Sequence, residues 1–425
     1  MPAPDVFLDD TIFAAATPPG NGALALVRVS GPRALALISS LPGAPGTWRH
    51  GRARHLRLTG LDDLVATAFL APRSFTGEDT VELSCHGSRL IVDRLLAALE
   101  AAGGRPAGPG EFTFRAVRHG KLTVAEAERL AHRLQARLPW ELELAETGED
   151  ARGAFADLLA HVNAARADLE SALEFDEGDG PDWEALAWPV RSLAAQARLQ
   201  ERWSRLPRVL LVGPVNAGKS TLLNRLSGFE RAIVSDRPGT TRDWLEVELR
   251  HDGVPFLLID SAGLRAAADP SDVEAEGMRL TRALADDADV LVAFRTVDGP
   301  DPTATLGQDA GDRTIRVQGK ADVTPAAPDS LPVSGRTGTG VLELLDRIVG
   351  CLRARRDHPP RWWFPARLVA LALELEADWD RLAAEPLPEV RACHLRELAA
   401  RLEAQLEVPP ADLYRLIFSR FCIGK

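Results

Sequence analysis

The chain has 425 residues, of which 45% are hydrophobic, and carries a formal net charge of −11. This length predicts about three domains, and the lack of any run of about 18 apolar residues excludes a membrane-spanning helix. The acidic balance argues against a dedicated nucleic-acid clamp, which is normally basic. Four scattered cysteines without zinc or thioredoxin spacing, and an N-terminus without a basic and then apolar segment, predict a cytoplasmic protein with no signal peptide.

Lysine is nearly absent from the sequence. Among 50 Lys and Arg residues the lysines are only Lys121, Lys219, Lys320 and Lys425. An ammonium is compact and a guanidinium is planar and forked, so a retained lysine indicates a site that requires the smaller group. Two of the four, Lys219 and Lys320, fall in nucleotide motifs, which favours a functional role for Lys121 and Lys425 as well. Solvated surface charge is the alternative for these two.

The first predicted domain covers residues 1–122 and has mixed α/β character. Residues 24–30 are β-rich and apolar on both faces, as is typical of an interior strand. Arg28 within this strand needs an anionic partner, which is either a ligand or a carboxylate of the same domain. Residues 80–86 alternate, so that Glu82 lies on the face opposite the core.

Helical spacing dominates the regions on both sides of a central α/β unit. The segments with this spacing are 124–138, 150–175, 183–206, 368–406 and 411–420. We therefore predict one discontinuous helical domain, made of residues 123–206 and 353–425, with a domain of residues 207–352 inserted into it. The Trp362-Trp363-Phe364 run would either stack bases or, as we expect, pack against the helical domain.

A glycine-rich loop, Gly213-Pro-Val-Asn-Ala-Gly-Lys-Ser220, organises the inserted domain. It follows an apolar, β-rich segment and precedes a helical pattern, which is the context that a G-x-x-x-x-G-K-[ST] motif requires. Gly213 and Gly218 allow a nest of N–H groups that binds phosphate. Lys219 is expected to reach the β- and γ-phosphates, and Ser220 to bind Mg²⁺. A plain glycine turn is the alternative, but it leaves the lysine unexplained.

Motifs further along the chain favour GTP over ATP. The loop 237–243 offers a threonine that closes the Mg²⁺ shell and senses the γ-phosphate. In the D-x-x-G motif, Asp260 would hold Mg²⁺ through water, and the Gly263 N–H would contact the γ-phosphate. Asp322 would accept both N1–H and N2–H of guanine, a donor pair that adenine lacks. The Gly335 N–H would reach guanine O6.

The inserted domain is therefore predicted to be a Ras-like P-loop GTPase domain with a parallel α/β sheet. Its expected strands are 208–212, 243–250, 255–260, 289–294, 313–318 and 330–333. The guanine motif departs from the usual pattern, because Gly319 stands where GTPases normally have asparagine. We expect guanine specificity to survive and affinity to be reduced. The connection 296–312 is also short for a full crossover helix.

End to end, the chain resembles the MnmE (TrmE) family of bacterial tRNA-modification GTPases. The residues that carry the resemblance, beside the inserted GTPase domain, are Asp10–Gly20, Ser74–Asp79, Pro109–Phe112, Lys121-Leu122 and the C-terminal Phe421-Cys-Ile-Gly-Lys425. The resemblance implies an N-terminal α+β domain that binds tetrahydrofolate and dimerises the protein. Arg28, Glu82, Lys121 and Lys425 match the folate-contacting positions, and Cys422 matches a cysteine near the modification site. A buried free thiol is the alternative for Cys422.

In the nucleotide domain the resemblance implies two cations. Ser220 and Thr241 match Mg²⁺ ligands, and a potassium ion takes the part of an arginine finger where GTPase domains dimerise. The residues matching the potassium site are Asn216, Ser235, Arg237 and Thr240. Glu274 matches the residue that orients the attacking water, with Glu276 as the alternative. Motifs and resemblance together assign to GTP Asn216, Ala217, Gly218, Lys219, Ser220, Thr221, Ser235, Asp236, Arg237, Pro238, Gly239, Thr240, Thr241, Asp260, Ser261, Ala262, Gly263, Lys320, Asp322, Ser334, Gly335 and Arg336.

The function that the resemblance implies is potassium-stimulated GTP hydrolysis coupled to tRNA modification. A homodimer would act with the FAD-containing partner MnmG (GidA), as a heterotetramer, to add a (carboxymethyl)aminomethyl group at carbon 5 of the wobble uridine. The carbon donor would be 5,10-methylenetetrahydrofolate, for which 5-formyltetrahydrofolate is an analogue. Two alternatives are a ribosome-assembly-type GTPase switch, which should carry a basic RNA-binding module, and a degenerate family member with weakened GTP binding, suggested by Gly319.

Overall fold

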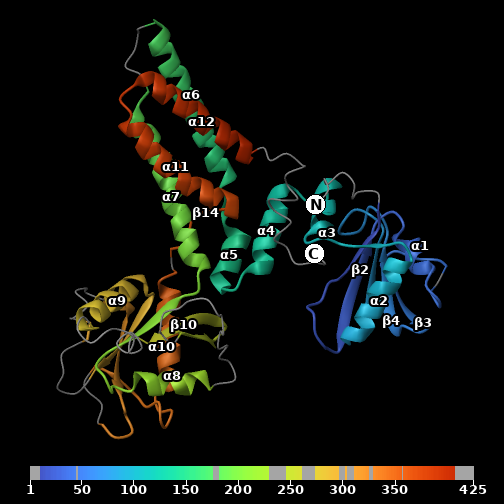
Figure 1. The fold of residues 1–425 in the computed structure, drawn as a ribbon, viewed down its shortest axis with the longest axis horizontal. Helices are drawn as coiled ribbons and strands as arrows, with labels where there is room; N and C mark the ends of the chain where they lie inside the picture. Colours follow the sequence, from blue (N-terminus) through green and yellow to red (C-terminus); the bar gives the residue numbers. More distant parts are fainter. Residues whose placement is uncertain are drawn as a thin grey trace. The chain divides into compact units, whose positions relative to one another are not determined.

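The computed structural model describes residues 10–44, 46–175, 181–228, 246–260, 273–295, 302–303, 311–324, 329–356 and 358–406 (Figure 1). Contacts divide the chain into two compact units. The first contains residues 1–135, 152–186 and 380–425, and the second contains residues 136–151 and 187–379. This division is coarser than the four predicted segments, whose boundaries 1–122, 123–206, 207–352 and 353–425 stay a prediction.

A six-stranded sheet forms the N-terminal part of the first unit, in the order β3-β4-β5-β2-β1-β6. Neighbouring strands are antiparallel, except that β6 is parallel to β1. Helix α2 lies along this sheet (Figure 1). The elements are β1 (Ile12–Ala15), β2 (Leu24–Ser30), α1 (Ala34–Ser39), β3 (Ala53–Leu58), β4 (Asp62–Phe69), β5 (Thr80–His86), α2 (Arg89–Ala101), β6 (Arg105–Pro106) and α3 (Glu111–Arg118).

The predicted alternation of β5 is confirmed. Val81, Leu83 and Cys85 are almost fully buried, and burial raises the pKa of the Cys85 thiol. Strand β2 is interior to the sheet, as its apolar sequence predicts. In the antiparallel register of β2 and β5, Arg28 lies directly opposite Glu82.

The helices of the first unit include α4 (Val124–Gln135), α6 (Arg152–Phe175) and α12 (Pro388–Leu406). Helices α6 and α12 lie side by side (Figure 1). Helix α4 begins at a capping box, in which the Glu126 carboxylate accepts hydrogen bonds from the Thr123 N–H and hydroxyl, and the Thr123 hydroxyl accepts one from the Glu126 N–H.

Two predicted helical segments are divided in the structure. The segment 124–138 ends at Gln135, and a separate helix α5 (Pro139–Thr147) follows. Pro139 restricts Leu138 to an extended conformation and favours the first turn of a new helix. The segment 368–406 likewise comprises α11 (Ala366–Ala384) and α12, and α12 begins at another proline.

The second unit contains a six-stranded sheet in the order β13-β12-β11-β8-β10-β9. On β8, Val209 and Leu211 join the core with α8 and α10, whereas Leu210 and Val212 join the core with α9. Helices therefore cover both faces (Figure 1). The elements are β8 (Arg208–Val212), α8 (Lys219–Ser227), β9 (Glu246–His251), β10 (Val254–Asp260), α9 (Val273–Asp287), β11 (Val290–Arg295), a 3-10 turn (Gly311–Arg313), β12 (Thr314–Gly319), β13 (Leu331–Val333) and α10 (Val341–Ala354).

The expected strands are found, but the sheet is not parallel throughout. Strand β9 pairs antiparallel with β10 at one edge. Asp252 and Gly253 join the two strands and both have positive φ, of 45° and 77°. An Asp-Gly pair with positive φ at both positions is the preferred connection of a tight hairpin. This turn sequence was the overlooked signal for the antiparallel strand.

The Trp-Trp-Phe run packs into the second unit. Trp362–Trp363 form β14, which pairs with β7 (Glu149–Asp150), and helix α7 (Trp183–Ser204) contributes Gln200 to the same region. Gln200 donates to the Phe364 carbonyl and accepts from the Phe364 N–H. Trp363 and Phe364 are each 1% exposed. The packing alternative is therefore confirmed for these two residues, and base stacking by them is excluded.

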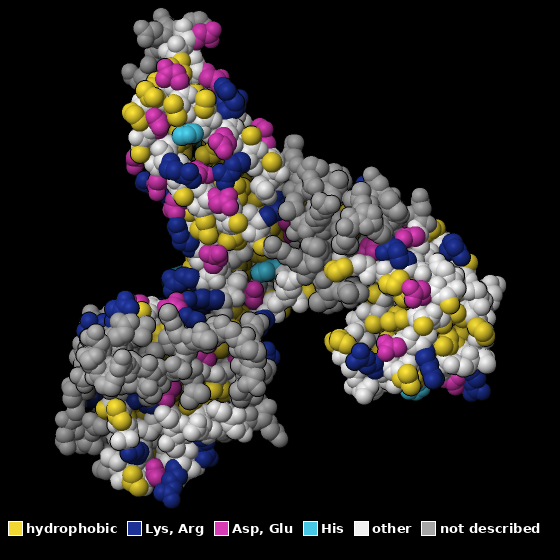
Figure 2. Space-filling model, in the orientation of Figure 1, with side chains coloured by type: hydrophobic (Ala, Val, Ile, Leu, Met, Phe, Trp, Pro, Cys, Tyr) yellow, Lys and Arg dark blue, Asp and Glu magenta, His cyan; other side chains and the backbone are white. Residues whose placement is uncertain are grey.

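Searched over its described residues, the chain has no helix that is both long and apolar enough to cross a membrane. On the face shown in Figure 2, basic and acidic side chains are interspersed within each described part.

Candidate functional site

The loop between β8 and α8 has the backbone conformation of a phosphate-binding loop. Gly213, Asn216 and Gly218 have φ of 145°, 64° and 101°, which turn successive peptide groups in a way that favours glycine. Gly218 is the N-cap of α8, so the first N–H groups of that helix face the loop. This arrangement of strand, loop and helix N-terminus suits an anion such as phosphate.

Lys219 is held within the curve of this loop. The side chain is 4% exposed, and its Nζ donates to the carbonyl oxygens of Gly213 and Pro214, each at 2.8 Å. A buried ammonium is stable only where acceptors surround it. The loop therefore fixes the position of a positive charge beside the N-terminus of α8.

The two side chains expected around Mg²⁺ meet directly. The Ser220 hydroxyl donates to Asp260 Oδ2 at 2.8 Å, and Asp260 is 2% exposed at the end of β10. Strands β8 and β10 are parallel neighbours, so both residues lie at the carboxyl edge of the sheet. A hydroxyl and a carboxylate are oxygen ligands of the kind that Mg²⁺ prefers. Thr241, the other predicted Mg²⁺ ligand, lies outside the described residues.

The guanine motifs are also brought together. Ser334 is fully buried after β13, and its hydroxyl donates to Asp322 Oδ1 at 2.7 Å. This hydrogen bond holds the pKa of Asp322 below its ordinary value, and the positive charges of Arg336 and Lys320 act in the same direction. The carboxylate that is expected to read guanine therefore stays ionised and is oriented by a neighbouring motif.

Gly335 connects this region to helix α8, which follows the phosphate loop. A Cβ added at Gly335 would lie 2.7 Å from the backbone N of Leu222 in α8, so only glycine permits this approach. Sequence reasoning overlooked Arg225, whose guanidinium donates to the carbonyls of Gly335, Arg336 and Thr337 at 3.0 to 3.4 Å. Contacts to backbone carbonyls 110 to 112 residues away give no local sequence signal.

Several predicted site residues cannot be placed. Of the four proposed potassium ligands, only Asn216 is described, and its side chain is exposed. Glu274 and Glu276 belong to α9, but only the helix backbone is described there. The predicted residues outside the described ranges are Ser235, Asp236, Arg237, Pro238, Gly239, Thr240, Thr241, Ser261, Ala262, Gly263, Cys422 and Lys425.

In the N-terminal domain, Arg28 and Glu82 form an ion pair. Arg28 Nε and Nη2 lie 3.0 and 2.8 Å from Glu82 Oε1, and the side chains are 20% and 26% exposed. The carboxylate partner predicted for Arg28 is thus an intradomain one. The guanidinium also lies 5.9 Å from the Phe75 ring and 5.7 Å from the Phe112 ring. Lys121 donates to the Pro72 carbonyl at 3.0 Å, near the start of the segment that carries Phe75.

Several carboxylates of the N-terminal motifs form ion pairs with a buried arginine that sequence reasoning overlooked. Arg115 is fully buried in α3 and binds the carboxylates of Asp10, Glu78 and Glu111. Arg105 binds Asp10 and Glu111 as well. Burial opposes ionisation of Asp10, but the hydrogen bonds from both arginines outweigh it and lower its pKa. These motif carboxylates therefore stabilise the domain through ion pairs with Arg105 and Arg115.

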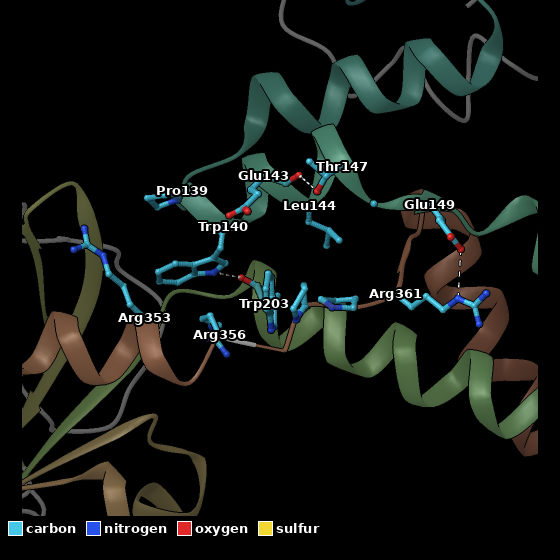
Figure 3. A pocket seen from close by; sticks show the side chains of 13 residues that line it. Pro139, Trp140, Glu143, Leu144, Thr147, Glu149, Trp203, Arg353, Arg356 and Arg361 are labelled. Carbon is cyan, nitrogen blue, oxygen red and sulfur yellow. Dashed lines mark hydrogen bonds and ion pairs between the residues drawn. The ribbon is translucent and has the colours of Figure 1, made fainter.

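A pocket of about 780 Å³ in the second unit is distinct from these sites (Figure 3). Trp140 donates to the Trp203 carbonyl at 2.9 Å on one side of it. Its arginines are already paired: Arg353 with Asp252, Arg356 with Asp289, and Arg361 with Glu149. None of the predicted site residues lines it, so the pocket is not the nucleotide site.

Two sequence families match parts of the chain. Residues 11–121 match the family described as "GTP-binding protein TrmE N-terminus", and residues 208–318 match the "50S ribosome-binding GTPase" family. The tRNA modification GTPase MnmE of Paracoccus denitrificans is 39% identical over 435 residues, covering 98% of this chain and 100% of that protein. The chain belongs to the MnmE family.

Other MnmE proteins match over the same extent. That of Alkalilimnicola ehrlichii is 38% identical, covering 98% of this chain and 99% of the relative, and that of a Thermus thermophilus strain is 37% identical, covering 98% and 100%. The ribosome-binding family matches only the nucleotide domain, whereas the MnmE relatives match the chain from end to end. A TrmE N-terminal domain and a P-loop GTPase domain are thus both present, in an MnmE context.

Proposed function

We propose that this protein is a GTP-hydrolysing enzyme of tRNA modification, which acts at carbon 5 of the wobble uridine and adds a (carboxymethyl)aminomethyl group there. The observation that carries the proposal is the end-to-end match to proteins named tRNA modification GTPase MnmE, which includes both recognised domains. The geometry of the phosphate loop supports the GTPase part independently.

Each described residue of the nucleotide domain has a distinct part in this proposal. Lys219 places a positive charge against the β- and γ-phosphates, and the helix N-terminus beside it offers N–H donors. Ser220 and Thr241 would bind Mg²⁺, and Asp260 would hold the ion through water; when bound, the ion would neutralise charge on the phosphate oxygens. Asp322 accepts the two guanine N–H groups, and Ser334 orients it. The proximity of Ser220 to Asp260 and of Ser334 to Asp322 supports these assignments.

Potassium stimulation is part of the proposal. Asn216 stands inside the phosphate loop with a left-handed backbone and an exposed side chain, so that its carboxamide oxygen is accessible to a cation. Ser235, Arg237 and Thr240 would complete the site where two GTPase domains meet. A fixed monovalent cation there stabilises the charge that develops in the transition state. Glu274 would orient the attacking water.

The N-terminal domain is proposed to bind 5,10-methylenetetrahydrofolate. The partly exposed Arg28–Glu82 pair offers adjacent hydrogen-bond donors and acceptors, which suits the polar edge of a pterin. Lys121, and Lys425 from the C-terminus, would supply positive charge for the carboxylates of the folate. Cys422 would lie near the modification site. The discontinuous helical domain, formed by residues 123–206 and 353–425, would carry this C-terminal segment.

Partners complete the proposal. A cytoplasmic homodimer would act with the FAD-containing MnmG, and this partner would supply much of the tRNA surface, since the chain itself has a net charge of −11.

Nucleoside analysis of tRNA from a deletion strain tests the main proposal. We expect loss of the carbon-5 substituent from wobble uridines, and unchanged wobble uridines would refute it. GTP turnover in KCl and in NaCl separates the alternatives. Strong stimulation by potassium supports the family mechanism, whereas negligible turnover in both salts favours a degenerate member.

A further inference from the structure

Gly319 is buried at the end of β12, where the guanine motif of GTPases normally begins with asparagine. Its φ lies outside the left-handed range, so its backbone conformation does not itself require glycine. Glycine is required because the space around the position is too small for a Cβ atom. A Cβ at this position would lie 1.9 Å from the Ala217 carbonyl oxygen and 3.0 Å from Cδ1 of Phe294. Cβ atoms in proteins essentially never lie within 3.0 Å of such neighbours.

The closer of these two neighbours belongs to the phosphate loop. Ala217 lies between Asn216 and Gly218, and the atom in question is a backbone oxygen, which cannot rotate away as the end of a side chain can. The guanine motif and the phosphate loop are therefore in direct backbone contact at Gly319.

A second glycine repeats this close approach at the other end of the loop. A Cβ at Gly213 would lie 2.6 Å from the Phe294 carbonyl oxygen and 2.8 Å from its Cβ. Phe294 is fully buried in β11, next to β12. Gly213 and Ala217 of the phosphate loop are thus in close contact with the ends of strands β11 and β12.

We propose that Gly319 is a positioning residue, which replaces the bracing side chain of asparagine by letting the guanine motif rest directly on the phosphate loop. This contact fixes the distance between Asp322 and the loop that binds phosphate. The proposal rests on the proposed GTPase function. It gives a counterintuitive expectation: in this chain, asparagine at position 319 would push the two motifs apart and weaken nucleotide binding.

The experiment compares GDP affinity, by calorimetry on the full chain, among wild type, Gly319→Asn, Gly319→Ala and Gly350→Ala. Gly350 is the matched control, because it is exposed in α10 of the same unit and has nothing within 4 Å of its added Cβ. We expect the dissociation constant to rise about tenfold or more for both Gly319 variants, as for an overpacked core. The control should match the wild type.

Steady-state GTP kinetics give a second readout. The KM for GTP should rise while kcat stays within about threefold, because Asp322, which the substitution displaces, is proposed to contact guanine and not the reacting phosphate. Equal or tighter GDP binding by Gly319→Asn would overturn the inference. So would a failure of both Gly319 variants to fold when Gly350→Ala folds, because Gly319 would then serve folding and not nucleotide placement. A wild type that does not bind GDP would instead refute the proposed GTPase function.

Discussion

Replacing Arg115 by methionine should destabilise the N-terminal domain more than any surface substitution in it. Methionine keeps much of the side-chain volume but removes the guanidinium that binds Asp10, Glu78 and Glu111. Among the described residues, Arg105 would still bind two of these carboxylates, Asp10 and Glu111. Glu78 would keep a hydrogen bond from Ser30 but would lose the guanidinium.

The expected cost follows from burial. The Arg115 side chain is 1% exposed, Glu111 5% and Glu78 9%, so solvent cannot replace the lost partner. Breaking a buried ion pair by removing one partner typically costs about 3–5 kcal/mol. Because Asp10 is 32% exposed and can be hydrated, we expect a value near the lower end, about 3 kcal/mol.

Hydrogen exchange measures this cost within one domain. A loss of about 3 kcal/mol should accelerate exchange of the amides of β1 and β5 by roughly a hundredfold, if these amides exchange through opening of the domain. The amides of β8, in the second unit, serve as the internal reference. Arg118→Met is the matched control, since Arg118 is exposed on the same helix. Unchanged protection of β1 and β5 in Arg115→Met would refute the reasoning.

Three further substitutions test residues of the second unit. Lys219→Arg should reduce GTP turnover at least about a hundredfold, because a forked guanidinium does not fit the space of a buried ammonium. A rate of phosphate release within tenfold of the wild-type rate would contradict this. Asp322→Asn should weaken GDP binding about a hundredfold, because two charge-assisted hydrogen bonds to guanine are lost. Because the pKa of Asp322 is lowered, the ratio of the calorimetric dissociation constants of this variant and wild type should stay constant from about pH 5 to 8. Burial opposes ionisation of Asp287, but hydrogen bonds from Arg205 and Arg208 lower its pKa. Its stabilisation is therefore present above the ordinary pKa of 3.8 and is lost as pH falls through the lowered value. The melting temperatures of wild type and Asp287→Asn should converge on acidification, from a gap worth about 1 kcal/mol or less at neutral pH.

The strands of the nucleotide domain were predictable because apolar runs and glycine loops are local signals. Strand β8 has the predicted bounds, and Asp322 and Ser334, which the motifs assigned to one guanine site, lie next to each other. The direct hydrogen bond between these two residues was not predicted. Strand β9 was predicted at 243–250, but its antiparallel direction was missed, although the Asp252-Gly253 turn signalled it.

Buried polar networks were not predictable from the same signals. Arg115 reaches Glu78 and Asp10 across 37 and 105 residues of chain, and nothing in the periodicity of α3 marks it as a cation that serves several motifs. The acidic residues in those motifs were visible, but their shared partner was not. Long-range ion pairs depend on how strands and helices are placed, which a reading of local patterns does not supply.

Lys219 and Lys121 differ in how far they support the idea that lysine is kept only where an ammonium is required. Lys219 lies buried among carbonyls, where an ammonium fits and a guanidinium does not. Lys121 is exposed and donates to the Pro72 carbonyl, a contact that a guanidinium would also make. Lysine scarcity therefore supports the nucleotide loop more strongly than the folate site. The proposed folate site is better supported by the Arg28–Glu82 pair, whose members lie opposite each other in register and remain partly open to solvent.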